Sequence, residues 1–198
     1  MEPLRPLNAN VTMIRRDLAA LPHHALPEGL AIRPYAPGDE RAWVAIQSAA
    51  DAHNVITERL FRDQFGDDPG DLARRLFLLV DRTTEVAGAG RAIGTAAAWF
   101  DDTNRGAGFG RVHWLAIHPD QQGRGLAKPL LGHVCVTLRE LGHERAFLTT
   151  STARIPAIGL YLSFGFVPEI DGPEDVTAWN ALRRTAPWLA HWLDGAPP

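Results

Sequence analysis

"HPDQQGRGLAKPLL", residues 118–131, is the stretch of sequence that decides the fold. An apolar segment ends at His118-Pro119, two glycines bracket Arg124, and a leucine-rich helical pattern begins at once. One glycine is enough for a turn into a helix, so the second glycine needs another reason. The first N–H groups of a helix have no intrahelical acceptor, and the helix dipole is positive at that end. The stretch is therefore typical of an anion site.

Gly123 and Gly125 have no Cβ atoms to hold a phosphate away from these amides. Arg124 and Lys128 add positive charge, and Pro129 lies in the first turn, where a missing N–H costs little. The stretch lacks the G-K-[ST] of a P-loop and the third glycine of the dinucleotide-binding G-x-G-x-x-G. Considered alone, it is explained more simply as a strand-to-helix turn that needs positive φ.

The flanking hydrophobic spacing places this turn in a βαβ unit. Residues 111–118 form an apolar run typical of a strand buried on both faces. Apolar residues recur at helical spacing from Gly125 to Leu141, and residues 145–152 predict the next strand. Further strands are expected at 30–35, 75–82, 91–100 and 166–170, and helices at 39–50, 56–65, 155–164 and 174–193 (broken near Pro187). This order predicts a mixed α/β (α+β) fold.

Composition excludes several classes of protein. The 198 residues carry a net charge of −3, against the basic surface of a general nucleic-acid binder. Cys135 is the only cysteine, so an intramolecular disulfide is impossible. The N-terminus has no apolar signal segment, and the longest apolar runs are too short to span a membrane, so we expect a cytoplasmic protein without membrane contact. No histidine has the spacing of a metal ligand, so no metal site is predicted.

The boundaries of the single expected domain follow from proline content and pattern. Residues 1–29 are predicted as an N-terminal arm, 30–170 as the core, and 171–198 as a C-terminal helical extension. Within the arm, residues 11–18 ("VTMIRRDL") have strand character, and we hypothesise that they supply an edge strand of the sheet. The tryptophan-rich C-terminal helix either packs on the sheet or forms a homodimer contact.

Two motifs together resemble the GCN5-related N-acetyltransferase (GNAT) superfamily. "QGRGLA" at 122–127 fits its Q/R-x-x-G-x-G/A signature, and "AIGLYLSFGFVP" at 157–168 resembles its second signature, one strand later. The resemblance covers residues 30–170. It implies a twisted mixed sheet whose fourth and fifth family strands splay apart, with helices on both faces.

The resemblance also implies a cofactor, acetyl-coenzyme A, as acetyl donor. Backbone amides of the glycine loop then hold the pyrophosphate, and the strand before it pairs with the pantetheine arm and polarises the thioester carbonyl. The residues implied in cofactor binding are Leu115, Ala116, Ile117, Gln122, Gly123, Arg124, Gly125, Leu126, Ala127 and Lys128.

Two proton transfers accompany the reaction that the resemblance implies. Tyr161 is at the position of the family's general acid, although its spacing alone is that of a core aromatic. The strand at 111–118 lacks the glutamate base of many relatives and offers His113, which resembles the relay histidine of arylalkylamine acetyltransferases. A packed strand histidine is an equally good interpretation. Arg111 stands where the second histidine of that relay would be, which weakens the comparison.

The function implied is acetyl transfer to a primary amine of a small molecule. Acetylation of a protein lysine or N-terminus is one alternative, and a non-catalytic acyl-coenzyme A sensor is another. Acceptor specificity is expected from the first two helices and their loop, including Trp43, His53, Asn54 and Phe61, together with the arm after Phe166. Aromatic residues at such positions are, however, more often core.

Overall fold

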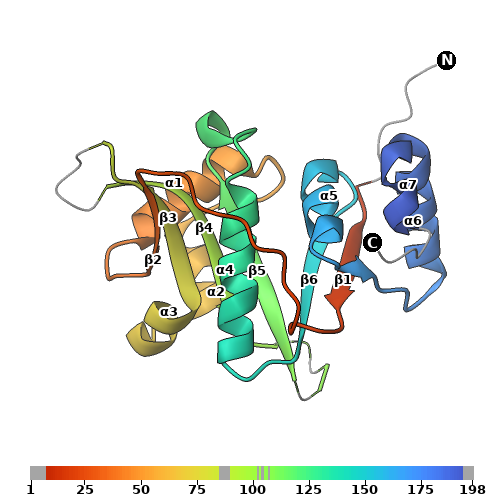
Figure 1. Ribbon diagram of the computed structural model, residues 1–198, viewed down its shortest axis with the longest axis horizontal. Helices are drawn as coiled ribbons and strands as arrows, with labels where there is room; N and C mark the ends of the chain where they lie inside the picture. Colours follow the sequence, from red (N-terminus) through yellow and green to blue (C-terminus); the bar gives the residue numbers. More distant parts are fainter. Residues whose placement is uncertain (1–7, 85–89, 102, 104, 107, 194–198) are drawn as a thin grey trace.

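The computed structural model describes residues 8–84, 90–101, 103, 105, 106 and 108–193. Its centre is a seven-stranded mixed sheet of order β2-β3-β4-β5-β6-β1-β7, which confirms the predicted fold class (Figure 1). The strands are β1 (Asn10–Arg15), β2 (Leu30–Pro34), β3 (Leu76–Asp81), β4 (Arg91–Trp99), β5 (Phe109–Ile117), β6 (Arg145–Ser151) and β7 (Val167–Pro168).

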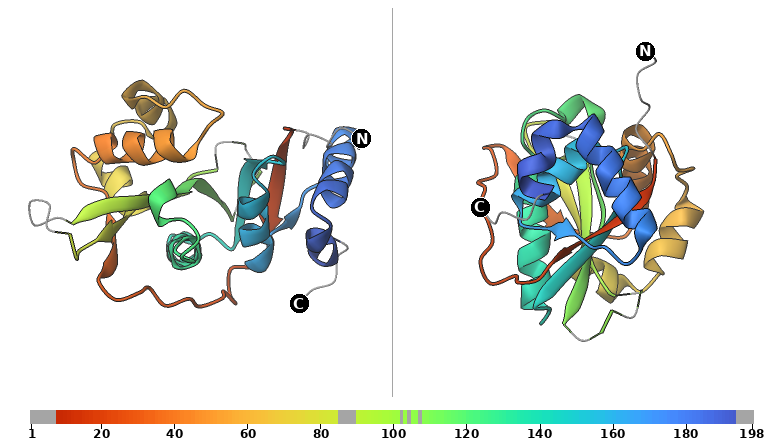
Figure 2. Two further views of the ribbon diagram at one scale, coloured as in Figure 1. Left: turned by 90° about the horizontal axis from the view of Figure 1, so that it is seen from above. Right: turned by 90° about the vertical axis from the view of Figure 1, so that its right-hand side faces the viewer.

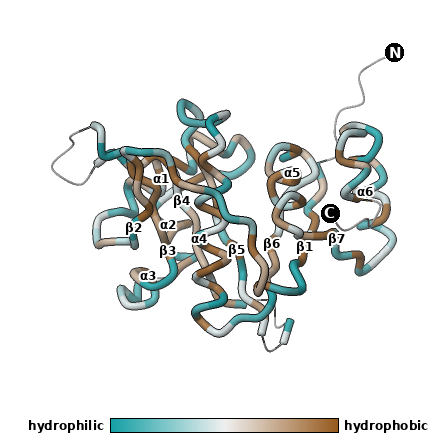
Figure 3. The backbone as a smooth tube through the Cα atoms, viewed as in Figure 1, coloured by the Kyte–Doolittle hydropathy of each residue, from teal (hydrophilic) through white to brown (hydrophobic). Residues whose placement is uncertain are grey.

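Helices cover both faces of this sheet (Figure 2). They are α1 (Glu40–Ala50), α2 (Glu58–Phe65), α3 (Pro69–Arg75), α4 (Ala127–Glu140), α5 (Ile155–Ser163), α6 (Pro173–Thr185) and α7 (Ala190–Leu193), with short 3-10 turns η1 (Pro119–Gln121) and η2 (Pro187–Leu189). Successive residues of β4 alternate between two cores: Ala96 and Ala98 face the core under α4, and Ala97 and Trp99 face the core under α1 and α2. Figure 3 shows the hydrophobic residues concentrated along these strands and on the helix faces toward them.

The expected splay lies between β5 and β6. The two strands pair in parallel only from Phe109 to Arg111, opposite Arg145 to Phe147. Beyond that point β5 keeps its partner β4 and contains a bulge, where Trp114 has a φ of 48°. Such a φ is strained for a bulky residue, so surrounding contacts must hold it. The bulge leaves the β6-facing edge of Leu115–Ile117 open.

The N-terminal arm contributes β1 to the sheet, as hypothesised, but the expected edge position is wrong. β1 pairs antiparallel with β6 along its whole length and with β7 at Met13 and Ile14. The chain then crosses the α4 side of the sheet to reach β2 at the far edge (Figure 2), with Leu18 buried on the way. β7 occupies the edge, a position that tolerates Pro168, which has no N–H to donate.

We predict that Met13→Ala destabilises the whole domain. Met13 is 0% exposed and lies between Leu148 of β6 and Pro168 of β7. Truncating a fully buried methionine costs about 2–5 kcal/mol of the free energy of unfolding. Urea denaturation measures this loss. Val176→Ala, on the exposed side of α6, is the control and should change the free energy of unfolding by less than about 0.5 kcal/mol.

The C-terminal extension packs against the core, one of the two predicted alternatives. Trp179 and Leu182 of α6 are buried, and the helix ends before Pro187 as expected. Trp188 is 64% exposed. None of the helices in the described ranges is long and apolar enough to cross a membrane.

Candidate active site

The loop between β5 and α4 forms an open cradle of backbone amides. Gly123 and Gly125 have φ of 74° and 75°, and a Cβ added at either would meet no atom within 4 Å. Over the described residues, the amides of five consecutive residues have no hydrogen-bond acceptor, namely those of Gly123, Arg124, Gly125, Leu126 and Ala127. Since these amides stand at a helix N-terminus and no atom approaches the Cβ positions of the two glycines, the loop fits a diphosphate group.

Side chains hold this loop in place and add charge. Gln122 Nε2 donates to the carbonyl oxygen of Ile117 at 2.9 Å, tying the loop to the end of β5. Leu126 is buried in the core beneath α4, whereas Arg124 and Lys128 are exposed. Arg124 donates a hydrogen bond to the Gln121 side chain. The glycines therefore supply access and the two cations supply positive potential.

The segment Leu115–Ile117 leads from the bulge to this loop along the open edge of β5. Ala116 and Ile117 are buried on the β4 side, and Leu115 packs partly against the core. Because β6 has diverged, main-chain groups on this edge have no strand opposite them. An extended amide-containing chain, such as a pantetheine arm, has the shape and hydrogen-bonding groups to add there.

Tyr161 lies on α5, the helix that follows β6. Its side chain is 7% exposed, and its ring packs at 6.1 Å from that of Phe166. Burial raises the pKa of Tyr161 to about 12, while the charge of Arg154 acts in the opposite direction. The phenol is therefore fully protonated at neutral pH and available as a proton donor.

His113 lies on β5, immediately before the bulge, and points into the aromatic core on the α1–α2 side. Its ring is 5.4 Å from that of Phe65 and 5.9 Å from that of Trp114. Burial, with a smaller contribution from the Arg111 charge, lowers the pKa of His113 to about 3. The imidazole is neutral at pH 7, so it can accept a hydrogen bond or a proton but cannot retain the proton.

We predict that His113 makes the protein acid-sensitive. The pKa of His113 is about 3 in the folded state and 6.5 for a free histidine, so the unfolded chain binds an extra proton between these values. Stability is thus lost as the pH falls below 6.5, by about 2 kcal/mol for this group at pH 5. His113→Gln should remove this contribution from the difference between the free energies of unfolding measured at pH 7 and at pH 5. An unchanged difference would show that His113 protonates freely in the folded protein.

The acceptor residues expected from sequence separate into two groups. Trp43 and Phe61 are 0% and 1% exposed and are core residues, the alternative interpretation given above. His53 and Asn54 are exposed in the loop between α1 and α2. Sequence patterns gave no signal for three residues around that loop, Gln47, Asp51 and Arg154, because the contacts of Gln47 with Trp114 and of Asp51 with Arg154 join residues distant in the chain.

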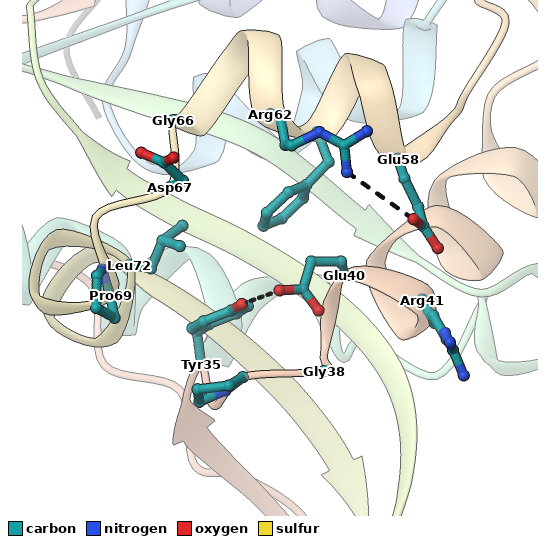
Figure 4. A pocket seen from close by; sticks show the side chains of 12 residues that line it. Tyr35, Gly38, Glu40, Arg41, Glu58, Arg62, Gly66, Asp67, Pro69 and Leu72 are labelled. Atoms are coloured by element: carbon teal, nitrogen blue, oxygen red, sulfur yellow. Dashed lines mark hydrogen bonds and ion pairs between the residues drawn. The ribbon is translucent and has the colours of Figure 1, made fainter.

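A cavity of about 660 Å³ lies under α1, α2 and α3, and none of the predicted cofactor or catalytic residues lines it. Figure 4 shows that its charged groups are partly paired: Tyr35 donates a hydrogen bond to Glu40, and Arg62 lies 3.9 Å from Glu58. Among the described residues, no three His, Cys, Asp or Glu side chains cluster in a way that could hold a metal ion.

The fold and the glycine loop are those expected of an acetyltransferase of the GNAT family, and comparison with known proteins supports this assignment. The model of the acetyltransferase (GNAT) family matches residues 41–166, so the chain belongs to this family. Acetyltransferases of the family use acetyl-coenzyme A as acetyl donor. A GCN5-related N-acetyltransferase from Sphaerobacter thermophilus superposes with a TM-score of 0.66 at 24% identity, covering 83% of this chain and 50% of that one.

Two curated relatives bear a more particular name. The chain is 35% identical to a mycothiol acetyltransferase of Pseudarthrobacter chlorophenolicus over 161 residues, which are 75% of this chain and 46% of the relative. It is 32% identical to a mycothiol acetyltransferase of Streptomyces coelicolor over 164 residues, 78% of this chain and 48% of the relative. The chain thus spans about half the length of these relatives.

Proposed function

We propose that this protein transfers the acetyl group of acetyl-coenzyme A directly to a primary amine of a small molecule. The observation that carries the proposal is the cradle of unpaired amides from Gly123 to Ala127, which opens beside the splay between β5 and β6. The loop binds the pyrophosphate, and the open edge at Leu115–Ile117 binds the pantetheine arm. The thioester then lies between β5 and α5, within the region that His113 and Tyr161 flank.

In this proposal Tyr161 is the general acid. Attack by the amine forms a C–N bond and breaks the C–S bond, and the departing thiolate needs a proton. A free thiol has a pKa of roughly 8.5, so the thiolate is a fair leaving group and the acid contributes only part of the rate. Tyr161 retains its proton until negative charge develops on sulfur, because burial disfavours the phenolate.

His113 is the proposed relay for the proton that the amine must lose. An alkylammonium of pKa about 10.4 is neutral in only about one molecule in a thousand at pH 7, so removal of this proton is the costlier transfer. The neutral imidazole of His113 is the proposed acceptor of this proton. Because burial lowers its pKa to about 3, His113 is a weak base, and the proton has to move on to solvent in the same step. This role is that of a relay between amine and solvent.

A small-molecule acceptor is supported by the name of the relatives, mycothiol acetyltransferase. The experiment is a thiol-release assay with acetyl-coenzyme A and a panel of small amines, lysine peptides and N-terminal peptides. Turnover on small amines supports the proposal. Turnover only on peptides favours protein acetylation. Tight binding of acetyl-coenzyme A without turnover on any amine favours an acyl-coenzyme A sensor.

Two further parts of the proposal concern the cellular compartment and the oligomeric state of the protein. We propose that it acts in the cytoplasm, supported by a sequence whose only cysteine, Cys135, is a buried free thiol. We also propose a homodimer, supported by the exposed Trp188 beside the packed C-terminal helices. Sedimentation of the wild type and of Trp188→Ser tests the second point: a monomeric wild type would contradict it.

A further inference from the structure

The C-terminal end of α1 is organised by one buried carboxylate. The Asp51 side chain is 7% exposed and accepts hydrogen bonds from the backbone N–H groups of His53 at 2.8 Å and Asn54 at 3.3 Å. It also accepts a hydrogen bond from Asn54 Nδ2 at 2.7 Å. Burial raises the pKa of Asp51, but the hydrogen bonds from Asn54 and His53 and the charge of Arg154 together lower it by more. The pKa of Asp51 therefore lies below its ordinary value. Asp51 therefore shapes the start of the α1–α2 loop.

The same carboxylate reaches across the molecule to the start of α5. Arg154 Nη2 lies 2.7 Å from Asp51 Oδ2, and the two residues are 103 positions apart in the chain. Arg154 is the N-cap of α5, and its carbonyl oxygen accepts the first hydrogen bonds of that helix, from Ala157 and Ile158. Tyr161 follows it by seven residues, two helical turns later on the same side of α5.

These contacts bridge the gap where β5 and β6 diverge. In Figure 1, α1 and α5 flank that gap. One turn before Asp51, Gln47 Nε2 donates to the carbonyl oxygen of Trp114 in the bulge of β5, at 2.7 Å. The last turn of α1 is thus bonded to β5 on one side through Gln47 and to α5 on the other through Asp51. Both contacts therefore lie on the path that connects the bulge to the helix that carries Tyr161.

We propose that Asp51 and Arg154 are positioning residues that hold the α1–α2 loop and α5 together across the acceptor side of the transfer site. The pair sets the place of His53 and Asn54, the exposed polar residues of that loop, relative to the thioester. The inference rests on the proposed function. It predicts a role in binding and orienting the amine and no role in binding coenzyme A, because the proposed phosphate loop precedes α4, which covers the other face of the sheet from α1.

The variants Asp51→Asn and Arg154→Met each remove one charge of the pair with little change of volume. We expect the KM for the amine to rise about tenfold in both, with the Kd of coenzyme A unchanged within about threefold. Arg154→Met also lowers kcat, because it removes the positive charge that favours the Tyr161 phenolate. Arg154→Lys retains that charge and should recover most of the kcat. The double variant should lose no more than the worse single variant.

Arg33→Met is the matched control. Arg33 pairs with Asp39 at the opposite end of α1, with side chains 27% and 14% exposed, against 37% and 7% for Arg154 and Asp51. The Arg33→Met variant removes an ion pair of similar burial at the N-terminal end of the same helix, α1, away from the splay. Its KM and kcat should therefore stay within about twofold of the wild-type values. If KM rose equally in this control, the effect of the Asp51 and Arg154 variants would be explained by a general loss of stability, and the inference would be overturned.

Hydrogen exchange separates failure of this inference from failure of the proposed function, because it needs no acceptor. Asp51→Asn should speed exchange both at residues 52–57 and at the first turn of α5. Unchanged exchange at α5 overturns the bridge even if no amine is ever turned over. If the wild type is active and both single variants keep the wild-type KM for the amine, the positioning role is overturned while the proposed function stands.

Discussion

Replacing Gly125 with glutamate is expected to abolish binding of coenzyme A. Gly125 has a φ of 75°, in the left-handed region, where a side chain costs about 1–2 kcal/mol of strain. The glutamate also brings a negative charge to the N-terminal end of α4, where the amides from Gly123 to Ala127 have no acceptor. Since both effects act at the proposed pyrophosphate site, we expect the affinity to fall on the order of 100-fold or more, measured by calorimetry.

Two further glycine variants separate charge from strain. Gly125→Ala introduces the strain without the charge and should weaken binding by about tenfold or less. Gly142→Glu, at the other end of α4, places the same residue at a φ of 89°, again with no atom within 4 Å of its Cβ. Its Kd for coenzyme A should equal that of the wild type. Wild-type binding by Gly125→Glu would remove this loop from the cofactor site.

Tyr161→Phe is expected to lower kcat by about 10- to 100-fold while the Kd of coenzyme A stays nearly the same. The substitution removes only the hydroxyl group, and the ring retains its packing against Phe166. The loss is modest because a thiolate with a pKa of about 8.5 leaves without strong help from an acid. Single-turnover kinetics are the appropriate measurement, since slow product release would mask a loss in the chemical step.

The sequence contains one other tyrosine, which provides the control for this change. Tyr35 donates a hydrogen bond to Glu40 on the α1 side of the sheet, away from the splay. Tyr35→Phe removes a hydroxyl from a similarly buried ring and should leave single-turnover rates unchanged. Equal rates for wild type and Tyr161→Phe would exclude Tyr161 as the acid and leave the proton to solvent.

Elements with a clear hydrophobic period were predictable. The strand before the glycine loop, the helix after it and the break near Pro187 all lie within two residues of their expected places. The short helix α3 was not predicted, because Pro69 and Gly70 resemble a turn and only seven residues follow the Asp68 cap. The last strand is shorter than expected: only Val167 and Pro168 are in regular strand conformation, and one further hydrogen bond joins the N–H of Glu169 to the carbonyl oxygen of Thr12 in β1.

The candidate site likewise has a part that was predictable from the sequence and a part that was not. The geometry of its glycine loop was predictable because all of the loop's parts are local: two glycines, an adjacent helix end and a preceding strand lie within about a dozen residues, and the binding of the cofactor there stays a prediction. The acceptor side was predicted poorly, since Trp43 and Phe61 are core residues and the ion pair of Asp51 with Arg154 was not foreseen. Local spacing carries no information about a contact between residues 103 positions apart.

The sequence by itself determined the family, the mixed fold and the place of the glycine loop that we propose as the phosphate cradle, because backbone conformation and helix-end chemistry depend on neighbouring residues. Only the tertiary structure decided that β1 lies between β6 and β7, that His113 is neutral in an aromatic core, and that Asp51 joins α1 to α5. Each of these depends on which distant segments meet, and burial and charge at such meetings set both the pKa values and the geometry of the site.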